Sequence, residues 1–356
     1  MVQLARARAR FGRKCASLAG AAACALGATA ANAATIKTTF DSSVTSRSNG
    51  AQIMAAFNNA AKTLGSALSN VATINVHVSW GKVNGASLGA GSLGTTVANM
   101  YGKFSYAQVK GWIAGAAATA TGNKALATAA KSLPASLTNG PTQFAIASAQ
   151  AKALGLIPSN QLGMDAYLGF SSSALFDFDP SNGINANAYN FQAVATHELS
   201  HALGRLTGIA SASPTWITPL DLFRYTAPGK RTTSYTAASY LSLDGGVTRL
   251  GDLNNSAGWD RSDWLSSTTG LGDVQAAAGK PGQSAAFSGA DVSVLQALGW
   301  GSTIAPNGSL LSPTQAAYSY MGSAAPEPAS WALMLMGTGL LGGMLRLQRS
   351  RARIPA

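Results

Sequence analysis

Residues 197–201 read His-Glu-Leu-Ser-His, and they hold two of the three histidines in a chain of 356 residues. On a helix, positions i and i+4 lie on one face about a turn apart, so His197 and His201 can bind one metal ion through their imidazole nitrogens. Glu198 projects toward the open position of that metal, where it can take a proton from a water molecule and deliver it to a leaving amine. Zinc suits this ligand set, and an open fourth position is typical of catalytic rather than structural zinc.

Hydrophobic spacing and turn residues predict the elements around the motif. Residues 191–203 are predicted to form the motif helix, and Gly204 is predicted to end it because glycine readily adopts positive φ. Hydrophobic spacing predicts further elements before it: strands at 35–40 and 73–80, a helix at 51–68, a helix within 106–120, a strand and then a helix at 144–154, and a hairpin at 167–178. Such strand–helix–strand units predict an α+β domain with a mixed sheet.

The half of the chain that follows the motif is rich in turns. Asp244-Gly245-Gly246 is predicted to lie between two short strands. A helix is expected at 291–298, followed by Gly299 and Trp300. We expect the active-site cleft between this turn-rich half and the half that precedes it.

A catalytic zinc usually takes three protein ligands, and the motif supplies two. The sequence HExxHxxG resembles the start of the metzincin zinc proteases, whose usual third ligand stands three residues after the glycine. That position is Thr207 here, a poor zinc ligand. The only other glutamate, Glu327, stands near the C-terminus, which excludes a downstream glutamate ligand. His77 is interpreted as a structural strand residue. The aspartates Asp221, Asp260 and Asp263 remain.

A wider resemblance favours Asp263. Leishmanolysin-like metzincins place the third ligand after a long insertion, and residues 197–300 resemble a family of predicted secreted metalloproteases with PEP-CTERM tails. The matching segments are His197 to Gly208, Leu220 to Tyr225, Leu243 to Gly246, Ser262-Asp263-Trp264 and Leu295 to Trp300. The resemblance implies that Asp263 replaces the third histidine of that family, and that its Met-turn methionine is replaced near Val274. A carboxylate also binds zinc. Asp221, and the absence of a third ligand, stay open as alternatives; Asp221 can instead cap a helix or pair with Arg224.

The N-terminus, residues 1–33, is interpreted as a secretory signal peptide. A basic run precedes an alanine-rich apolar stretch at 16–30, and Ala31-Asn32-Ala33 forms an A-x-A cleavage site. A membrane anchor is the alternative. Both cysteines, Cys15 and Cys24, lie inside this peptide. The mature protein is therefore expected to form no disulfide.

The C-terminus, residues 326–356, has three parts: Pro326-Glu327-Pro328, an apolar run at 331–345 and an arginine cluster. The order resembles a PEP-CTERM sorting tail. It implies a short transmembrane segment, transient retention in the inner membrane, processing by exosortase-type machinery, and delivery to the cell surface or the extracellular space. A plain C-terminal membrane anchor is the alternative.

Charge excludes one class of function. The net charge of +12 is concentrated at the two ends, because residues 34–325 hold 16 basic residues against 12 acidic ones. No basic stripe is interleaved with aromatic residues, so we expect no nucleic-acid partner.

Together these features predict an exported zinc endopeptidase. Its metzincin-like catalytic domain is expected at 34–322, with Glu198 as general base and Zn²⁺ on His197, His201 and Asp263. Its substrate would be a protein or peptide. The alternative is a catalytically degenerate protein that binds at the surface or in the extracellular matrix.

Overall fold

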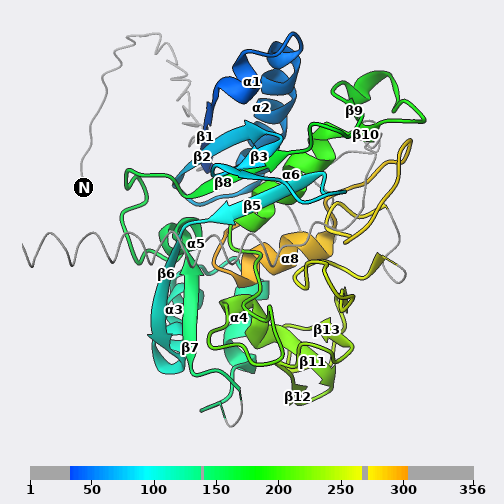
Figure 1. The fold of residues 1–356 in the computed structure, drawn as a ribbon. Coiled ribbons are helices and arrows are strands. Elements are labelled where there is room, and N and C mark those ends of the chain that lie inside the picture. Colours follow the sequence, from blue (N-terminus) through cyan, green and yellow to red (C-terminus); the bar gives the residue numbers. More distant parts are fainter. Residues whose placement is uncertain (1–32, 138–139, 267–271, 304–356) are drawn as a thin grey trace, which may run out of the picture. The chain divides into compact units, whose positions relative to one another are not determined.

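A four-stranded mixed sheet forms the first half of the fold (Figure 1). The computed structural model describes residues 33–137, 140–266 and 272–303. The sheet has the order β1-β2-β8-β5. Strands β1 (Thr35–Phe40), β2 (Thr73–Trp80) and β8 (Ala166–Phe170) are parallel, and β5 (Gly94–Ala98) is antiparallel to β8 at one edge.

The hydrophobic pattern of β2 explains which face of the strand packs against the core. Ile74, Val76 and Val78 alternate along the strand and are fully buried, as expected for one face of a strand against a core. Helix α2 (Gly50–Ala67) connects β1 to β2 and buries Ile53 and Phe57 in the same core. The crossover places α2 against the sheet, where it also contacts the motif helix.

Shorter elements complete the first half. Strands β6 (Met100–Ser105) and β7 (Gln143–Ala147) pair antiparallel as a separate ribbon. The glycine-rich segment after β2 holds a small hairpin of β3 (Lys82–Val83) and β4 (Ala86–Ser87). The remaining helices of this half are α1 (Ser42–Thr45), α3 (Tyr106–Thr119), α4 (Lys124–Ser132) and α5 (Ser148–Ala153).

The motif helix α6 (Phe191–Ala202) packs against β5, β8 and α2. The Asn190 side chain caps its N-terminus by accepting hydrogen bonds from the Gln192 and Ala193 amides, which satisfies two amides that lack partners within the helix. Gly204 follows its C-terminus with φ of +107°, so the predicted glycine stop is confirmed.

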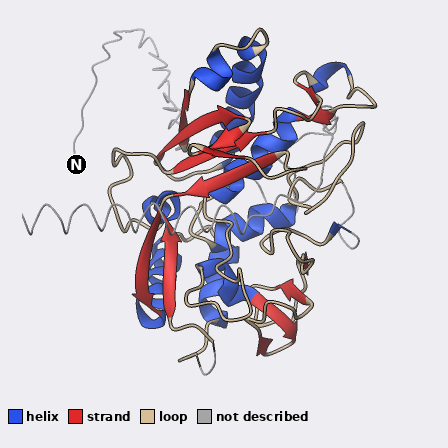
Figure 2. Cartoon of the chain, viewed as in Figure 1, coloured by secondary structure: helices blue, strands red, loops and turns tan. Residues whose placement is uncertain are grey.

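The second half is built mainly from loops, as Figure 2 shows. It contains a small antiparallel sheet of order β12-β11-β13-β14 and helix α8 (Gly289–Ala297). The strands are β11 (Arg224–Ala227), β12 (Lys230–Arg231), β13 (Ser239–Leu241) and β14 (Gly251–Leu253). Two 3₁₀ turns, η1 (Pro180–Asn182) and η2 (Pro219–Phe223), flank the motif helix in sequence.

The fold confirms most predicted elements, and the architecture is mixed α/β. The strands at 35–40 and 73–80 and the motif helix have nearly the predicted limits, and the Asp244 turn does lie between two short strands, β13 and β14. The hairpin predicted at 167–178 is wrong. Strand β8 pairs with β2 and β5, whereas β9 (Phe176–Asp177) pairs in parallel with β10 (Tyr189–Asn190). Strand β8 is an inner strand whose partners are distant in sequence, which a local pattern cannot reveal.

The expected terminal segments lie almost entirely outside the described residues. The tail at 326–356 lies outside the described residues, as do all but the last residue of the predicted signal peptide, residues 1–33. Within the described part of the chain, no helix is both long enough and apolar enough to span a membrane.

Candidate metal centre

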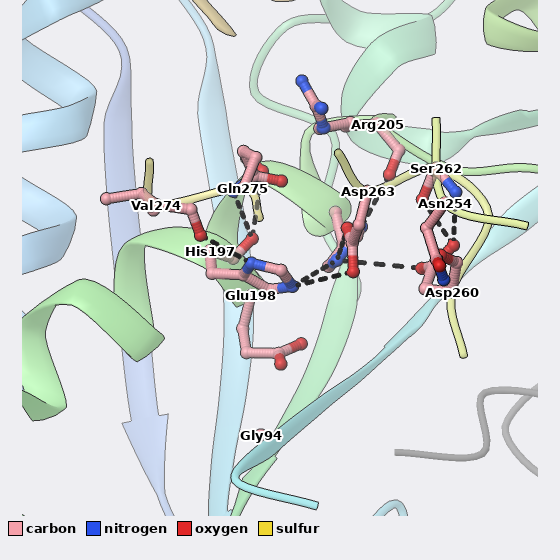
Figure 3. A network of polar contacts seen from close by, with 12 residues as sticks. Gly94, His197, Glu198, Arg205, Asn254, Asp260, Ser262, Asp263, Val274 and Gln275 are labelled. Carbon is pink, nitrogen blue, oxygen red and sulfur yellow. Dashed lines mark hydrogen bonds and ion pairs between the residues drawn. The ribbon is translucent and has the colours of Figure 1, made fainter. Parts of the chain in front are cut away.

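The two motif histidines turn their Nε2 atoms toward each other, 2.9 Å apart. Figure 3 shows His197 beside Val274 and Asp263. Each ring places its Nδ1 atom at a backbone carbonyl: His197 at Val274 O, 2.8 Å away, and His201 at Arg205 O, 2.6 Å away. A carbonyl oxygen can only accept, so each Nδ1 carries the hydrogen, and each neutral ring keeps its Nε2 lone pair for another partner. Carbonyl contacts of this kind fix the tautomer and orientation of metal-binding histidines.

The turn after the helix produces one of these contacts. Because Gly204 adopts positive φ, the chain reverses and brings the Arg205 carbonyl back to the His201 ring. The other contact comes from the second half of the protein, where Val274 stands.

Asp263 completes a group of three potential ligands. Its Oδ2 lies 3.6 Å from His197 Nε2, and its Oδ1 lies 3.4 Å from His201 Nε2. Ligand atoms of the three residues all lie within 4.8 Å of one another. Ligands about 2.0–2.1 Å from a tetrahedral zinc are about 3.3 Å apart. The two histidine–aspartate separations are close to this value, whereas the two Nε2 atoms are closer together, so the rings would have to move slightly apart around a zinc ion.

Neighbouring residues hold Asp263 in place. The Trp264 side chain is fully buried, and its Nε1 donates to Asp291 Oδ1 at 2.7 Å. The Arg205 guanidinium lies 4.3 Å above the Trp264 ring and also contacts Asp291, at 3.2 Å. The Asp263 carbonyl accepts from the Asn254 amide. The segment that carries Asp263 lies outside regular secondary structure, and it is held by the Trp264 side chain and by the hydrogen bond from Asn254.

The electrostatics of the group fit a cation. Burial lowers the pKa of His197 to about 3 and that of His201 to about 4, so both rings are neutral at pH 7. Burial, and then the neighbouring Asp260, raise the pKa of Asp263 well above its usual value. Asp263 Oδ1 accepts no hydrogen bond from the described residues although it is shielded from solvent. Two imidazole lone pairs facing a carboxylate form a donor set that a divalent cation such as zinc would satisfy.

Glu198 lies on the side of the group that faces β5. Its Oε2 accepts a hydrogen bond from the Thr96 hydroxyl at 2.7 Å. Gly94 lies beside the same carboxylate, because a Cβ built at Gly94 would stand 2.5 Å from Glu198 Oε1. Burial raises the pKa of Glu198 to about 8, with the Thr96 hydrogen bond acting in the opposite direction. A carboxyl group that titrates near neutral pH suits both the uptake and the release of a proton.

The other residues considered as ligands have different partners. Asp221 accepts hydrogen bonds from the Thr207 hydroxyl and from the Gly208 and Thr218 amides, so it organises the loop after the motif helix. It is not part of the three-residue group. Thr207 is one of its donors rather than a ligand. His77 lies on β2 beside the Thr39 hydroxyl.

Sequence patterns did not identify several residues around the group. Thr96 and Gly94 come from a strand about a hundred residues before Glu198, and Val274 contributes only a backbone carbonyl. Nothing in their local sequence marks these residues. Asp260 was one of three aspartate candidates, and its Oδ2 lies 3.8 Å from His201 Nε2.

Comparisons with known proteins identify the C-terminal segment. Residues 324–350 match the PEP-CTERM protein-sorting motif. This match supports an exported protein that is sorted at the membrane by exosortase-type machinery. No curated protein and no solved structure matches the chain.

Proposed function

We propose that this protein is an exported zinc endopeptidase with a metzincin-like catalytic domain. His197, His201 and Asp263 would hold the zinc ion, and Glu198 would act as general base. The observation that carries the proposal is the convergence of two Nε2 lone pairs and one carboxylate, with each Nδ1 set against a backbone carbonyl. Two neutral Nε2 lone pairs that face each other across 2.9 Å repel unless a cation or a proton lies between them. A purely structural role for the histidine pair does not explain this arrangement.

Bound zinc would supply Lewis-acid activation of a water molecule and of the scissile carbonyl. The protein supplies the proton transfer. Glu198 accepts a proton from the attacking water and passes it to the amine that leaves. Thr96 and Gly94 hold its carboxylate at the strand edge, so the base is positioned before substrate binds.

Strand β5 is the sheet edge next to Glu198, and an extended peptide could reach it only by displacing the contacts that bury all five of its residues. Strand β5 ends the sheet, pairs with β8 on one side and packs on the motif helix. A substrate that adds to its other edge would bind through backbone hydrogen bonds, which depend little on side-chain identity. We therefore propose broad sequence specificity for protein or peptide substrates.

The test is cleavage of an unfolded protein by the purified full chain with zinc, in parallel with the Glu198→Ala variant. The expected result is cleavage that the variant loses while it still binds zinc. Asp244→Asn is the matched control, because this loop carboxylate bonds to Ser242 and Thr248 and should leave cleavage unchanged.

Two other outcomes would contradict the proposal. Zinc binding without cleavage would favour the alternative of a degenerate protein retained for binding at the surface or in the matrix. Absence of zinc binding would remove the basis of the catalytic mechanism.

A further inference from the structure

Asp260 has a buried carboxylate oxygen that receives no hydrogen bond. The residue is 6% exposed and lies three positions before Asp263. Its Oδ1 accepts from the Ser262 amide at 2.6 Å and from the Ser262 hydroxyl at 2.7 Å. Its Oδ2 has no hydrogen-bond donor among the described residues and is shielded from solvent. Leaving a charged oxygen buried in this way costs several kcal/mol unless a cation or a water molecule is beside it.

The nearby arginines do not fill this role. Arg224 donates to the Arg261 carbonyl and the Ser239 hydroxyl. Arg261 donates to the Tyr235 and Ser256 carbonyls. Neither forms an ion pair with Asp260 within 4.0 Å in the described part of the chain, where the nearest titratable nitrogen is that of the neutral His201 ring, at 3.8 Å.

The oxygen faces the metal centre. Asp260 Oδ2 lies 3.8 Å from His201 Nε2, and Figure 3 shows Asp263 between His197 and Asp260. The two hydrogen bonds from Ser262 hold Oδ1, and this leaves Oδ2 directed at the centre.

We propose that Asp260 is a fourth protein group of the metal centre and strengthens the binding of a divalent cation by His197, His201 and Asp263. This inference rests on the proposed function. Two ligands of one ion are at most about 4.2 Å apart. Asp260 does not belong to the group whose ligand atoms all lie within 4.8 Å of one another, so it is too far away to be a direct ligand of the same ion. Its Oδ2 therefore acts from beyond the ligands, by its charge and through a water molecule between it and the ion.

A carboxylate in this position has a measurable effect on metal binding. Removing groups that surround metal ligands typically weakens metal affinity about 10–100-fold. The three ligands alone carry one negative charge, from Asp263. Asp260 supplies a second, so the four groups together neutralise a divalent cation.

The test compares zinc affinity in the full chain and in its Asp260→Asn variant, by competition with a chromophoric chelator. Asparagine keeps the shape and an oxygen that can accept from Ser262, but it removes the charge. The expected result is a zinc Kd raised about 10–100-fold. The metal-free melting temperature should not fall, because the uncompensated buried charge is gone, whereas the rise in melting temperature on adding zinc should shrink. A second variant, Ser262→Ala, removes the hydroxyl bond to Asp260 Oδ1 but keeps the amide bond, so it should raise the Kd by a smaller factor.

Asp244→Asn is the control for loss of an aspartate held by a serine hydroxyl and a backbone amide outside the centre. A zinc Kd within about twofold of the unchanged protein in both Asp260→Asn and Ser262→Ala would overturn the inference and leave the zinc site standing. Failure of the unchanged chain to bind zinc would overturn both this inference and the proposed function.

Discussion

The hydroxyl oxygen of Thr96 lies 2.7 Å from Glu198 Oε2 and so joins the edge strand of the sheet to the motif helix. The same hydroxyl lies 2.9 Å from the Glu198 backbone carbonyl. It has one hydrogen to donate, and the Glu198 carboxyl group is the stronger acceptor in its ionised form, which is the form that acts as base. The strand proposed to bind substrate thus also holds the proposed base.

Replacing Thr96 with valine keeps the branched shape and removes the hydroxyl. A lost hydrogen bond to a charged group is worth about 1.5–3 kcal/mol. We therefore expect kcat to fall about 10–100-fold, with zinc content unchanged. Thr96→Ser retains the hydroxyl and should stay within a few-fold of the unchanged protein. Steady-state kinetics with a peptide substrate give kcat and KM separately, and equal losses in the valine and serine variants would contradict a role for the hydroxyl.

Gly94→Ala tests the same contact by filling space. The new methyl group would stand 2.5 Å from Glu198 Oε1, so the carboxylate must move. We expect at least about a tenfold loss of kcat. Gly102→Ala is the matched control, since a Cβ there meets nothing within 4 Å. Similar kinetic effects of the two substitutions would show that the carboxylate does not depend on the space at Gly94.

The sequence was sufficient to predict the helix, its two histidines and the glycine that ends it. Spacing alone puts His197 and His201 on one face. Their orientation depends on carbonyls of Arg205 and Val274, and the second of these comes from 77 residues away. Backbone carbonyls leave no mark on residue identity, so this part of the site could not be predicted from the sequence.

Asp263 and Asp221 show the same limit for side chains. Both are buried aspartates downstream of the motif. The buried Trp264 and its contact with Asp291 bring Asp263 to the histidines, while Thr207, Gly208 and Thr218 supply the donors that occupy Asp221. Only tertiary packing distinguishes the two, which explains why the sequence left both open.

Replacing Asp263 should affect zinc affinity, whereas replacing Asp221 should affect folding stability. Asp263→Ala removes a proposed ligand, so we expect zinc affinity to fall by at least about a hundredfold while the metal-free protein stays folded. Asp221→Ala leaves three donors unsatisfied, so we expect a loss of about 2–4 kcal/mol of unfolding free energy in the metal-free protein. Chelator competition and urea unfolding measure the two effects. If only Asp221→Ala lost zinc affinity, Asp221 rather than Asp263 would be the zinc ligand, and the proposal would be wrong.

A buried ion pair outside the proposed metal centre supports the sheet. Lys152 Nζ lies 2.6 Å from Asp165 Oδ2, and both side chains are 2% exposed. Lys152→Met would leave the carboxylate charged and buried without its cation, so we expect a loss of about 3–5 kcal/mol of unfolding free energy. Lys131→Met, at the end of α4, removes an exposed lysine that has no ion-pair partner among the described residues, and it should change the free energy by less than about 0.5 kcal/mol. Urea unfolding of both variants checks the difference.

The raised pKa of Glu198 predicts how the stability of the metal-free protein depends on pH. Burial raises this pKa to about 8 in the folded protein, whereas the unfolded chain keeps a value of about 4.3. Between these values the folded protein binds more protons than the unfolded chain, so this group lowers the unfolding free energy as the pH rises. The glutamine in Glu198→Gln cannot ionise, so the unfolding free energy of this variant does not decrease with pH for this reason.

The advantage of Glu198→Gln should therefore grow from pH 5 to pH 8, by on the order of a few kcal/mol. Urea unfolding in the presence of a chelator at pH 5, 6.5 and 8 measures it. The pKa values of His197 and His201 are lowered by burial in both proteins, so their titration largely cancels in the difference. A constant difference across this range would mean that Glu198 is already ionised in the folded protein at pH 5, and that Thr96 and Gly94 hold a carboxylate rather than a carboxylic acid.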